Sequence, residues 1–540
     1  MKKSKLLLAL FSGLLLSASW PTYGFPYLLF FAFIPLFFLE KELKNKPKAI
    51  LKLWAYSFLA LIIWNAATTW WIWNSTVFGA LTAVVLNSLF MSFVWLIYAF
   101  SKKYYSANKN AIFLLPLYWV SFEYLHLDWD LSWSWLTLGN AFANHIYAVQ
   151  WYEYTGVFGG GWWIISVNIL LYRYLDKIQS SPKIARKYFL WLWPSLSLIM
   201  LPLVFSVFLY STYEEKGKEV EIVVLQPNMD PWSEQFLSPP QEVINRCIAL
   251  AKPLMTENTK FVLAPESAIQ ESLLEPDFTY AASSGGQSVS IPLLNGFLGA
   301  YPNTRLMIGV SSYAFLEKPT KTARTTNGGS YYDEYNTAIL LDHQGVETVY
   351  HKNKLVPGPE KMPFQKLLSP LQELAFDLGG TVGSLGSSED RPLFYSTDKS
   401  IAGAPLICYE SIYGGFVTEF VRQGAQVLFI ITNDGWWGET QGYKQHLAYA
   451  RLRAVECRRS VARSANTGVS AFVNQKGNII SQSSYGVQDA LVASIRANTE
   501  YTFYAKYGDY LGRLSAFVSV LLLLLSVAIW LKTPKSNSPT

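Results

Sequence analysis

Histidine and cysteine are scarce in this sequence, and their scarcity excludes several kinds of site. The 540 residues include five His and three Cys. Cys247, Cys408 and Cys457 show none of the paired spacings of a zinc site or a disulfide framework, and an odd number leaves at least one thiol free. The histidines lie in no recognisable Cys/His signature, which argues against a papain-like cysteine enzyme.

Charged residues are also few, and they are unevenly placed. They make up 15% of the chain against 51% hydrophobic residues, a balance too apolar for one ordinary soluble domain. The net charge is +6, but the basic residues outside the central stretch lie in short loops between apolar runs, so no nucleic-acid partner is indicated. We expect a transmembrane bundle over residues 1–215, a soluble domain over 216–500, and a last span with a short tail over 501–540.

Eight apolar runs are long enough to cross, or nearly cross, a hydrocarbon core of about 30 Å. They cover residues 6–20, 26–39, 53–73, 78–100, 111–124, 156–171, 189–210 and 514–531. We therefore predict about eight spans, seven before the soluble domain and one after it. The first run also has the layout of a cleavable signal peptide, and cleavage would leave the later topology unchanged.

Lysine and arginine are missing from alternate loops. Basic residues precede the first run and follow the second, fourth and sixth, whereas the loops between them, including residues 125–154, contain none. Because positive residues collect on the cytoplasmic side, we predict a cytoplasmic amino terminus and a soluble domain outside the cytoplasm. The Trp-rich and Gly-rich residues 131–140 and 155–161 fit an interfacial aromatic belt better than a lipid-lining role.

From residue 219 short β-branched runs alternate with helical stretches, which indicates an α/β domain. Strands are predicted at residues 222–225, 261–264, 306–310, 337–341, 346–350, 404–407, 427–431, 469–473 and 490–495. Helices are predicted at residues 241–255 and 443–459. In such a domain, functional side chains are expected where strands end.

Three polar residues stand just after predicted strands: Glu266 in FVLAPES, Lys352 in VYHKNKLVP and Cys408 in PLICYES. Taken singly, each has a plain structural explanation, namely a capping or paired Glu, a solvated Lys and a small buried Cys. Together they supply a base, an oxyanion-stabilising cation and a nucleophile. Lys354 would face the same way as Lys352, so spacing alone does not choose between them. A helix after Cys408 would lower the thiol pKa through its amide dipoles.

The motifs FVLAPES, YHKNKLVPGPE, APLICYES and ITNDGWWG, with HLAYARLRAVECRRS and RSANTG, resemble the nitrilase superfamily and its Glu, Lys, Cys triad. The flanking apolar spans narrow the resemblance to the apolipoprotein N-acyltransferase family, over essentially the whole chain. The resemblance implies an αββα sandwich on a helical bundle in the bacterial inner membrane, with the catalytic domain on the periplasmic side. It also implies a monomer without cofactor or metal, a phospholipid acyl donor, expected to be phosphatidylethanolamine, and the diacylglyceryl-cysteine amine of an apolipoprotein as acceptor.

Carried onto this sequence, the resemblance implies that Glu266 is the general base, Lys352 the oxyanion stabiliser and Cys408 the nucleophile. The family pattern of Tyr, one residue, then Lys chooses Lys352, which follows Tyr350, over Lys354. Supporting or substrate-binding roles are implied for Glu360, Tyr409, Glu410 and Trp232. The chain departs from the family by reading Gly-Pro where Phe-Gly is usual before Glu360, and by having Pro231 where a lysine is common.

Two rival functions stay open. A membrane-anchored nitrilase-type amidase could use the same triad, but it needs water at the site and gives no reason for eight spans. A transporter or structural membrane protein with an inert outer domain is disfavoured, because the spans lack paired charges, with Glu123 as the main exception. The apolar segment 358–376 beside the site is either a mobile lipid-facing lid or a segment packed on the sandwich.

Overall fold

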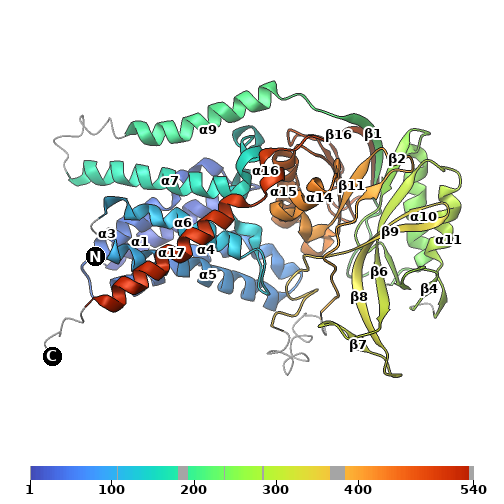
Figure 1. Ribbon diagram of the computed structural model, residues 1–540, viewed down its shortest axis with the longest axis horizontal. Helices are drawn as coiled ribbons and strands as arrows, with labels where there is room; N and C mark the ends of the chain where they lie inside the picture. The colour runs from blue at the N-terminus through green and yellow to red at the C-terminus, as the bar shows by residue number, and fades with distance from the viewer. Residues whose placement is uncertain are drawn as a thin grey trace. The chain divides into compact units, whose positions relative to one another are not determined.

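The protein is described here from a computed structural model, in which the chain forms two compact units (Figure 1). The described residues are 2–105, 108–180, 192–235, 237–282, 285–364 and 384–533. The helical unit comprises Met1–Trp70, Ala80–Leu209 and Asp509–Thr540, and the sandwich unit comprises Trp71–Gly79 and Tyr210–Gly508. Each unit is built from a different class of secondary structure, as the uneven composition predicts.

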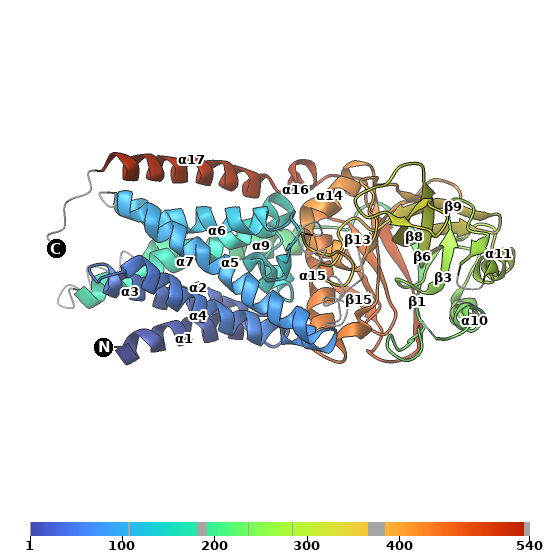
Figure 2. The same cartoon turned by 90° about the horizontal axis from the view of Figure 1, so that it is seen from below.

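The helical unit consists of apolar helices that run side by side (Figure 2). They are α1 (Lys2–Ala18), α2 (Leu29–Ala32), α3 (Ile34–Leu43), α4 (Ala49–Thr69), α5 (Val77–Tyr104), α6 (Leu114–Leu125), α7 (Tyr152–Ser180), α9 (Leu192–Thr212) and α17 (Tyr510–Lys532). Among the described residues, five helices are long and apolar enough to cross a membrane, namely α4, α5, α7, α9 and α17. These five correspond to five of the eight predicted spans.

The other three predicted runs are helical but shorter than a full span. Residues 6–18 of the first run lie in α1, which has 17 residues, and residues 19–20 follow its end. Residues 26–39 are divided between α2 and α3, because Phe33 interrupts the helix and Pro35 stands at the start of the next one. Residues 111–124 begin as a 3-10 turn, which leaves 12 residues for α6. All eight predicted runs therefore contain helix, but only five of them, among the described residues, are long enough to span a membrane.

Buried polar side chains join helices within the helical unit. Asn168 of α7 accepts a 2.9 Å hydrogen bond from the Phe33 amide and donates a 2.7 Å bond to the Leu29 carbonyl. Asn87 of α5 donates a 2.7 Å bond to Asn65 of α4. Interhelical hydrogen bonds of this kind help apolar helices to associate where burial of apolar surface gives no driving force.

The sandwich unit contains two sheets. The larger sheet has β1 (Lys218–Gln226), β2 (Thr259–Leu263), β3 (Ile269–Leu274), β4 (Tyr280–Ala281), β5 (Gly286–Gln287), β6 (Arg305–Leu316), β7 (Arg324–Thr325), β8 (Tyr331–Asp342), β9 (Gly345–His351) and β16 (Asp489–Ala497). Its order is β16-β1-β2-β6-β3-β4-β5, with β8 paired to β6, β7 and β9. Strands β1, β2 and β6 are parallel neighbours, so their carboxyl ends lie at one edge.

The smaller sheet has the order β10-β11-β12-β13-β14-β15. Its strands are β10 (Phe394–Tyr395), β11 (Ala402–Ile407), β12 (Val427–Thr432), β13 (Ser460–Ala465), β14 (Ala471–Val473) and β15 (Ile479–Gln482). Parallel pairing of β11, β12 and β13 again gathers their carboxyl ends. The two sheets face each other, and Phe261 of β2 meets Phe429 of β12 with ring centroids 4.9 Å apart.

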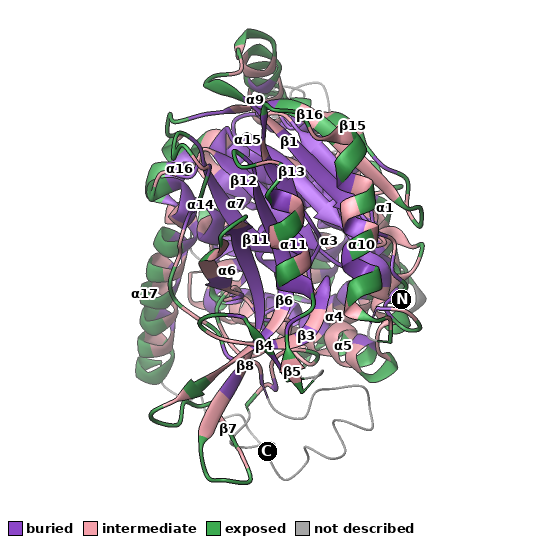
Figure 3. Cartoon of the chain, turned by 90° about the vertical axis from the view of Figure 1, so that its right-hand side faces the viewer, coloured by how far each residue is buried: buried purple, intermediate pink, exposed green. Residues whose placement is uncertain are grey.

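Helices cover the outer faces of both sheets. Helices α10 (Pro240–Ala251) and α11 (Ser290–Leu298) lie over the larger sheet with their exposed faces outward, while the strands behind them are buried (Figure 3). Helices α14 (Gly414–Arg422) and α15 (Gln441–Cys457) pack against the smaller sheet. These layers make the αββα sandwich that the resemblance implies, and the predicted fold class is confirmed.

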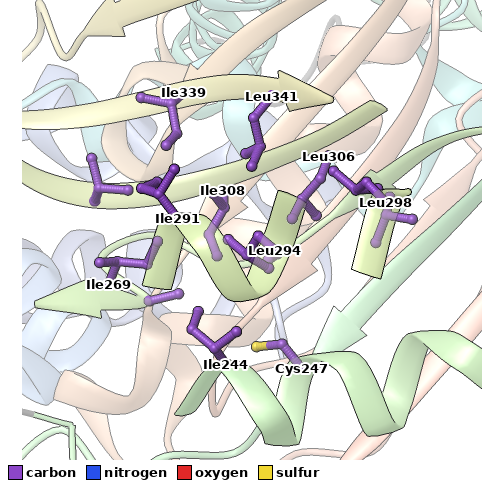
Figure 4. Packing of buried hydrophobic residues seen from close by; sticks show 14 of the residues in the cluster. Ile244, Cys247, Ile269, Ile291, Leu294, Leu298, Leu306, Ile308, Ile339 and Leu341 are labelled. Carbon is purple, nitrogen blue, oxygen red and sulfur yellow. The ribbon is translucent and has the colours of Figure 1, made fainter. Parts of the chain in front are cut away.

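A continuous apolar core joins α10 and α11 to the larger sheet (Figure 4). Ile244 and Cys247 of α10 and Leu294 of α11 pack toward Ile308 of β6 and Ile339 of β8. Burying each of the Ile and Leu side chains stabilises the fold by about 1.5–3 kcal/mol. This core holds the strands whose ends carry the site.

Every predicted strand of the α/β domain is a strand in the structure, and both predicted helices are present. The predicted helix 241–255 is α10 followed by a 3-10 turn, and the predicted helix 443–459 is α15, which ends at Cys457. Sequence periodicity missed strands β3, β4, β5, β7, β10, β13 and β15 and helices α11, α14 and α16 (Phe503–Tyr507). Helix α11 is only nine residues long, which is too short for a clear periodic signal.

Candidate active site

Three strand ends position the predicted triad. Glu266 lies three residues after β2, Lys352 directly after β9, and Cys408 directly after β11 as the first residue of a 3-10 helix, Cys408–Ile412. All three are buried, with 6%, 1% and 8% of their surfaces exposed. Gly309 of β6 lets the chain at Glu266 come this close, because a Cβ there would lie 2.6 Å from the Glu266 Cα.

Lys352 is held between two carboxylates. Its Nζ lies 2.9 Å from Glu266 Oε1 and 2.8 Å from Glu360 Oε1. Asn336 Nδ2 donates to the same two oxygens, at 2.8 Å each. Burial works against the lysine charge, but Glu266 and Glu360 prevail and hold its pKa well above the usual range. Lys352 therefore stays cationic. Lys352 and Asn336 bind the same two carboxylate oxygens, so the four side chains form a closed ring of polar contacts.

Lys354, the lysine that spacing alone could not exclude, lies in different surroundings. Its Nζ stands 5.8 Å from the centroid of the Tyr413 ring, and its side chain is only partly buried. Lys352 is thus the lysine that the fold brings to Glu266. Family pattern and geometry agree on this residue.

Cys408 has an unusual backbone and an unionised thiol. Its φ of 52° lies in the left-handed region, which costs a non-glycine residue free energy. Burial raises the pKa of its thiol well above the usual range, Glu266 adds to the rise, and Lys352 opposes it. The predicted helix after Cys408 exists as a five-residue 3-10 helix, but the expected lowering of the thiol pKa is wrong. Loss of hydration outweighs the amide dipoles of so short a helix.

Glu410 links the two sheets through backbone amides. Its Oε1 accepts from the Tyr350 hydroxyl at 2.6 Å and from the Asn353 amide at 2.7 Å, beside the end of β9. Its Oε2 accepts from the Ile407 amide at 2.8 Å, at the end of β11. The carboxyl group is fully buried, and burial raises its pKa. Glu410 therefore joins the segment that carries Lys352 to the segment that carries Cys408.

The other predicted residues lie around this centre. Glu360 also accepts the Val356 amide at 2.8 Å, which closes its own loop over Lys352. Tyr409 is buried, with its ring against Tyr413 at 5.2 Å. Trp232 is 59% exposed and packs edge-on against Trp436, with centroids 4.8 Å apart. The structure thus places Tyr409 inside the sandwich and Trp232 at its surface.

Two polar contacts of Glu266 come from residues that sequence reasoning did not assign. Asn336 is one of them, and the second is the Asn433 amide, which donates to Glu266 Oε2 at 3.1 Å. The Asn433 side chain donates in turn to Gln235 at 2.6 Å, and Gln235 donates to the Ser267 carbonyl at 2.8 Å. Asn433 stands in the motif ITNDGWWG, which was the available signal.

The predicted lid segment is only partly covered by the structure. Residues 365–376 lie outside the described residues, whereas Met362 is buried and Phe364 is exposed. Within the described ranges, no group of three His, Cys, Asp or Glu side chains could hold a metal ion. The site offers a thiol, a carboxylate and a fixed cation, which is a set suited to covalent acyl transfer.

Known protein families match both halves of the chain. A family model for the apolipoprotein N-acyltransferase N-terminal domain matches residues 12–170, and a carbon-nitrogen hydrolase model matches residues 221–503. The chain is similar to the apolipoprotein N-acyltransferase of Chlorobaculum tepidum, with 30% identity over 93% of this chain and 92% of that one. It is also similar to apolipoprotein N-acyltransferase 1 of Treponema denticola, with 26% identity over 96% and 95% of the two chains.

Among solved structures, a mutant amidase of the nitrilase superfamily from Nesterenkonia matches 55% of this chain and 98% of its own, with 16% identity and a TM-score of 0.37. Both halves of the chain match their own family model, and the similarity to the Chlorobaculum relative runs through both. The chain therefore belongs to the apolipoprotein N-acyltransferase family.

Proposed function

We propose that this membrane protein moves an acyl chain from a phospholipid to the N-terminal amine of diacylglyceryl-cysteine in apolipoproteins, through a thioester on Cys408. The observation that carries the proposal is the position of Lys352, buried and held by Glu266 and Glu360 beside a buried cysteine. A fixed cation next to a thiol and a carboxylate supplies each group that acyl transfer needs.

The first half-reaction acylates the enzyme. Glu266 takes the thiol proton of Cys408, and the sulfur adds to the ester carbonyl of the phospholipid. Lys352 stabilises the oxyanion, a contribution that for one such donor is about 10²–10³-fold in rate. The intermediate collapses, the C–O bond breaks, and the lysophospholipid oxygen takes the proton from Glu266 as it leaves. A thioester remains on Cys408.

The second half-reaction transfers the acyl group to nitrogen. The amine adds to the thioester carbonyl and gives a proton to Glu266, and Lys352 again stabilises the oxyanion. The C–S bond breaks, the amide is released, and the sulfur recovers its proton from Glu266. Going from ester to thioester to amide requires neither ATP nor a metal. Water must be kept from the thioester, because hydrolysis there would turn the transferase into a lipase.

Supporting roles follow from the contacts. Glu360 holds Lys352 together with Glu266, and Glu410 joins the two strand ends. Tyr409, next to the nucleophile in sequence, packs its ring against Tyr413. Trp232, exposed on the sandwich unit, contacts the incoming lipid.

The membrane arrangement is part of the same proposal. Residues 1–215 and 501–540 anchor the protein in the inner membrane, and residues 216–500 form the periplasmic catalytic domain. The absence of Lys and Arg from alternate loops supports this orientation. We further propose that the protein acts as a monomer and that phosphatidylethanolamine is the acyl donor.

Intact-mass measurement of the purified protein with phosphatidylethanolamine vesicles tests the proposal. The expected result is an acyl adduct on the wild type that hydroxylamine removes and that a diacylated lipopeptide discharges. Cys408→Ala should acquire no adduct. Cys457→Ala is the matched control, because Cys457 is also buried but lies at the end of α15, and it should acylate like the wild type. No adduct on the wild type, together with hydrolysis of small amides, would favour the amidase instead.

A further inference from the structure

Three of the quoted motifs contain no triad residue, yet one ionisable residue of each belongs to a buried cluster that reaches Cys408. Asp434 comes from ITNDGWWG, His446 from the helix HLAYARLRAVECRRS and Arg463 from the strand RSANTG. All three side chains are fully buried. Burying a charged group is costly unless it is paired, so a buried cluster of this kind needs an explanation.

The cluster forms a chain that ends on the nucleophile's backbone. Arg463 donates to Asp434 Oδ2 at 2.6 Å, and Asp434 Oδ1 lies 3.0 Å from His446 Nδ1. His446 Nε2 lies 3.1 Å from the carbonyl oxygen of Cys408, which also accepts from the Ser411 hydroxyl at 2.8 Å. A carbonyl oxygen only accepts, so Nε2 carries the proton and His446 is the donor.

His446 is fixed from several sides. Its Nδ1 also lies 3.2 Å from Arg463, and its Nε2 lies 3.0 Å from the Ser411 oxygen. The ring of Trp437 packs edge-on against the imidazole, with centroids 5.7 Å apart. Asp434 stays ionised despite burial, because Arg463 and His446 hold its pKa well below the usual range. The donor at Nε2 is therefore rigidly placed.

Asp434 is held on both of its carboxylate oxygens. Thr432 donates to Asp434 Oδ1 at 2.9 Å, and Arg463 donates to Oδ2 at 2.6 Å. The carboxylate that faces His446 is therefore fixed in place. Cys408 needs the support of this cluster, because its φ of 52° is unfavourable for a residue with a side chain.

We propose that His446 is a positioning residue for acyl transfer: its Nε2–H, held by the Asp434–Arg463 pair, binds the Cys408 carbonyl and keeps the nucleophile in its left-handed conformation. The proposal rests on the role of Cys408 given above. The three motifs that supply Asp434, His446 and Arg463 would then all help to position Cys408. No proton moves through His446 in this role, so its contribution is to orientation alone.

The test compares His446→Ala and His446→Gln with the wild type in the full-length protein. Glutamine can present an N–H donor near the position of Nε2, whereas alanine cannot. Three quantities are measured on each: the rate constant of thioester formation at saturating phosphatidylethanolamine, the apparent KM for that lipid, and the midpoint of thermal unfolding. Cys457→Ala is the control for a buried change on α15 that lies away from Cys408.

We expect His446→Ala to slow thioester formation about 100-fold, equivalent to about 2.7 kcal/mol of activation free energy, with KM within about twofold. His446→Gln should recover about tenfold of that loss. Cys457→Ala should acylate normally whatever its unfolding midpoint. A purely structural role would instead lower the unfolding midpoint and leave the rate constant of the folded fraction unchanged.

Several outcomes would overturn the inference. Thioester formation at the wild-type rate in His446→Ala would do so, and so would a folded His446→Gln that is as slow as His446→Ala. If His446→Ala does not fold, Ser411→Ala together with His446→Gln decides the matter, since each alters one of the two bonds to the Cys408 carbonyl and both should slow the same step. Failure of the wild type to form any thioester would refute the proposed function rather than this inference.

Discussion

Replacing Lys352 by methionine should both disable the site and destabilise the sandwich unit. Methionine has a similar length but no charge, so Glu266 and Glu360 would face each other across Asn336 with no cation between them. Removing one partner of a buried ion pair costs about 3–5 kcal/mol. The sandwich unit has about 300 residues, and at about 2.1 cal/mol/K of unfolding entropy per residue each kcal/mol lowers the unfolding midpoint by about 1.5 °C, so a drop of roughly 5–8 °C is expected.

The assay is thermal unfolding in detergent micelles, followed by intrinsic tryptophan fluorescence, with thioester formation measured in parallel. The informative control is the double variant Lys352→Met, Glu360→Gln, which has one fewer buried negative charge. It should be more stable than Lys352→Met alone and should remain inactive. Glu360→Gln by itself should destabilise the protein, because it takes a charged partner from Lys352.

Additive behaviour would refute this reasoning. If the double variant lost as much stability as the two single variants together, Lys352 and Glu360 would not interact in the folded protein. A Lys352→Met protein that unfolds at the wild-type midpoint would likewise show that the ion pairs of Lys352 do not stabilise the fold. Either result would also remove the argument that two carboxylates keep the lysine in its charged form.

Further predictions concern three separate groups. Glu266→Gln should abolish acyl transfer yet speed alkylation of Cys408 by iodoacetamide at pH 8, because burial and the Glu266 charge together raise the thiol pKa and only the first would remain. Tyr350→Phe removes the 2.6 Å hydrogen bond to Glu410 and should lower the free energy of unfolding by about 1.5–3 kcal/mol, measured by thermal unfolding. Burial raises the pKa of Cys247 to about 12, so stability should fall as pH rises from about 9 toward 12, and Cys247→Ala should show a shallower fall.

The positions of the three triad residues could be predicted because each follows the end of a short strand, and strand ends are where functional sites are assembled in α/β domains. The strands themselves were visible as β-branched runs, as with residues 427–431 in β12. The helical bundle was predicted from apolar length alone, and that criterion failed where Phe33 interrupts the run between α2 and α3. Where a helix is interrupted depends on local packing, and the hydropathy of the sequence does not reveal it.

The groups that hold the triad were harder to predict. Asn336 lies inside β8, and nothing in the sequence distinguishes it from other polar residues of that strand. Its hydrogen bonds to Glu266 and Glu360 join residues that are distant in sequence. Glu410 was identified through the resemblance, but its backbone partners at residues 353 and 407 depend on how the two sheets meet. The raised pKa of the Cys408 thiol could not be predicted from the sequence. Its largest cause is burial, and how deeply a side chain is buried depends on the folded chain.

The contacts of Glu410 also bear on how the sandwich can move. Apolar burial between two stacked sheets is non-directional, so by itself it fixes their register less strictly than hydrogen bonds do. Here one carboxylate binds amides on both sheets, so sliding would have to break charge-assisted hydrogen bonds in a buried place. Lys352 and Cys408 should therefore keep their separation while the surrounding layers fluctuate. Other parts of the protein could then move to accommodate acyl chains of different length, while the catalytic groups keep their geometry.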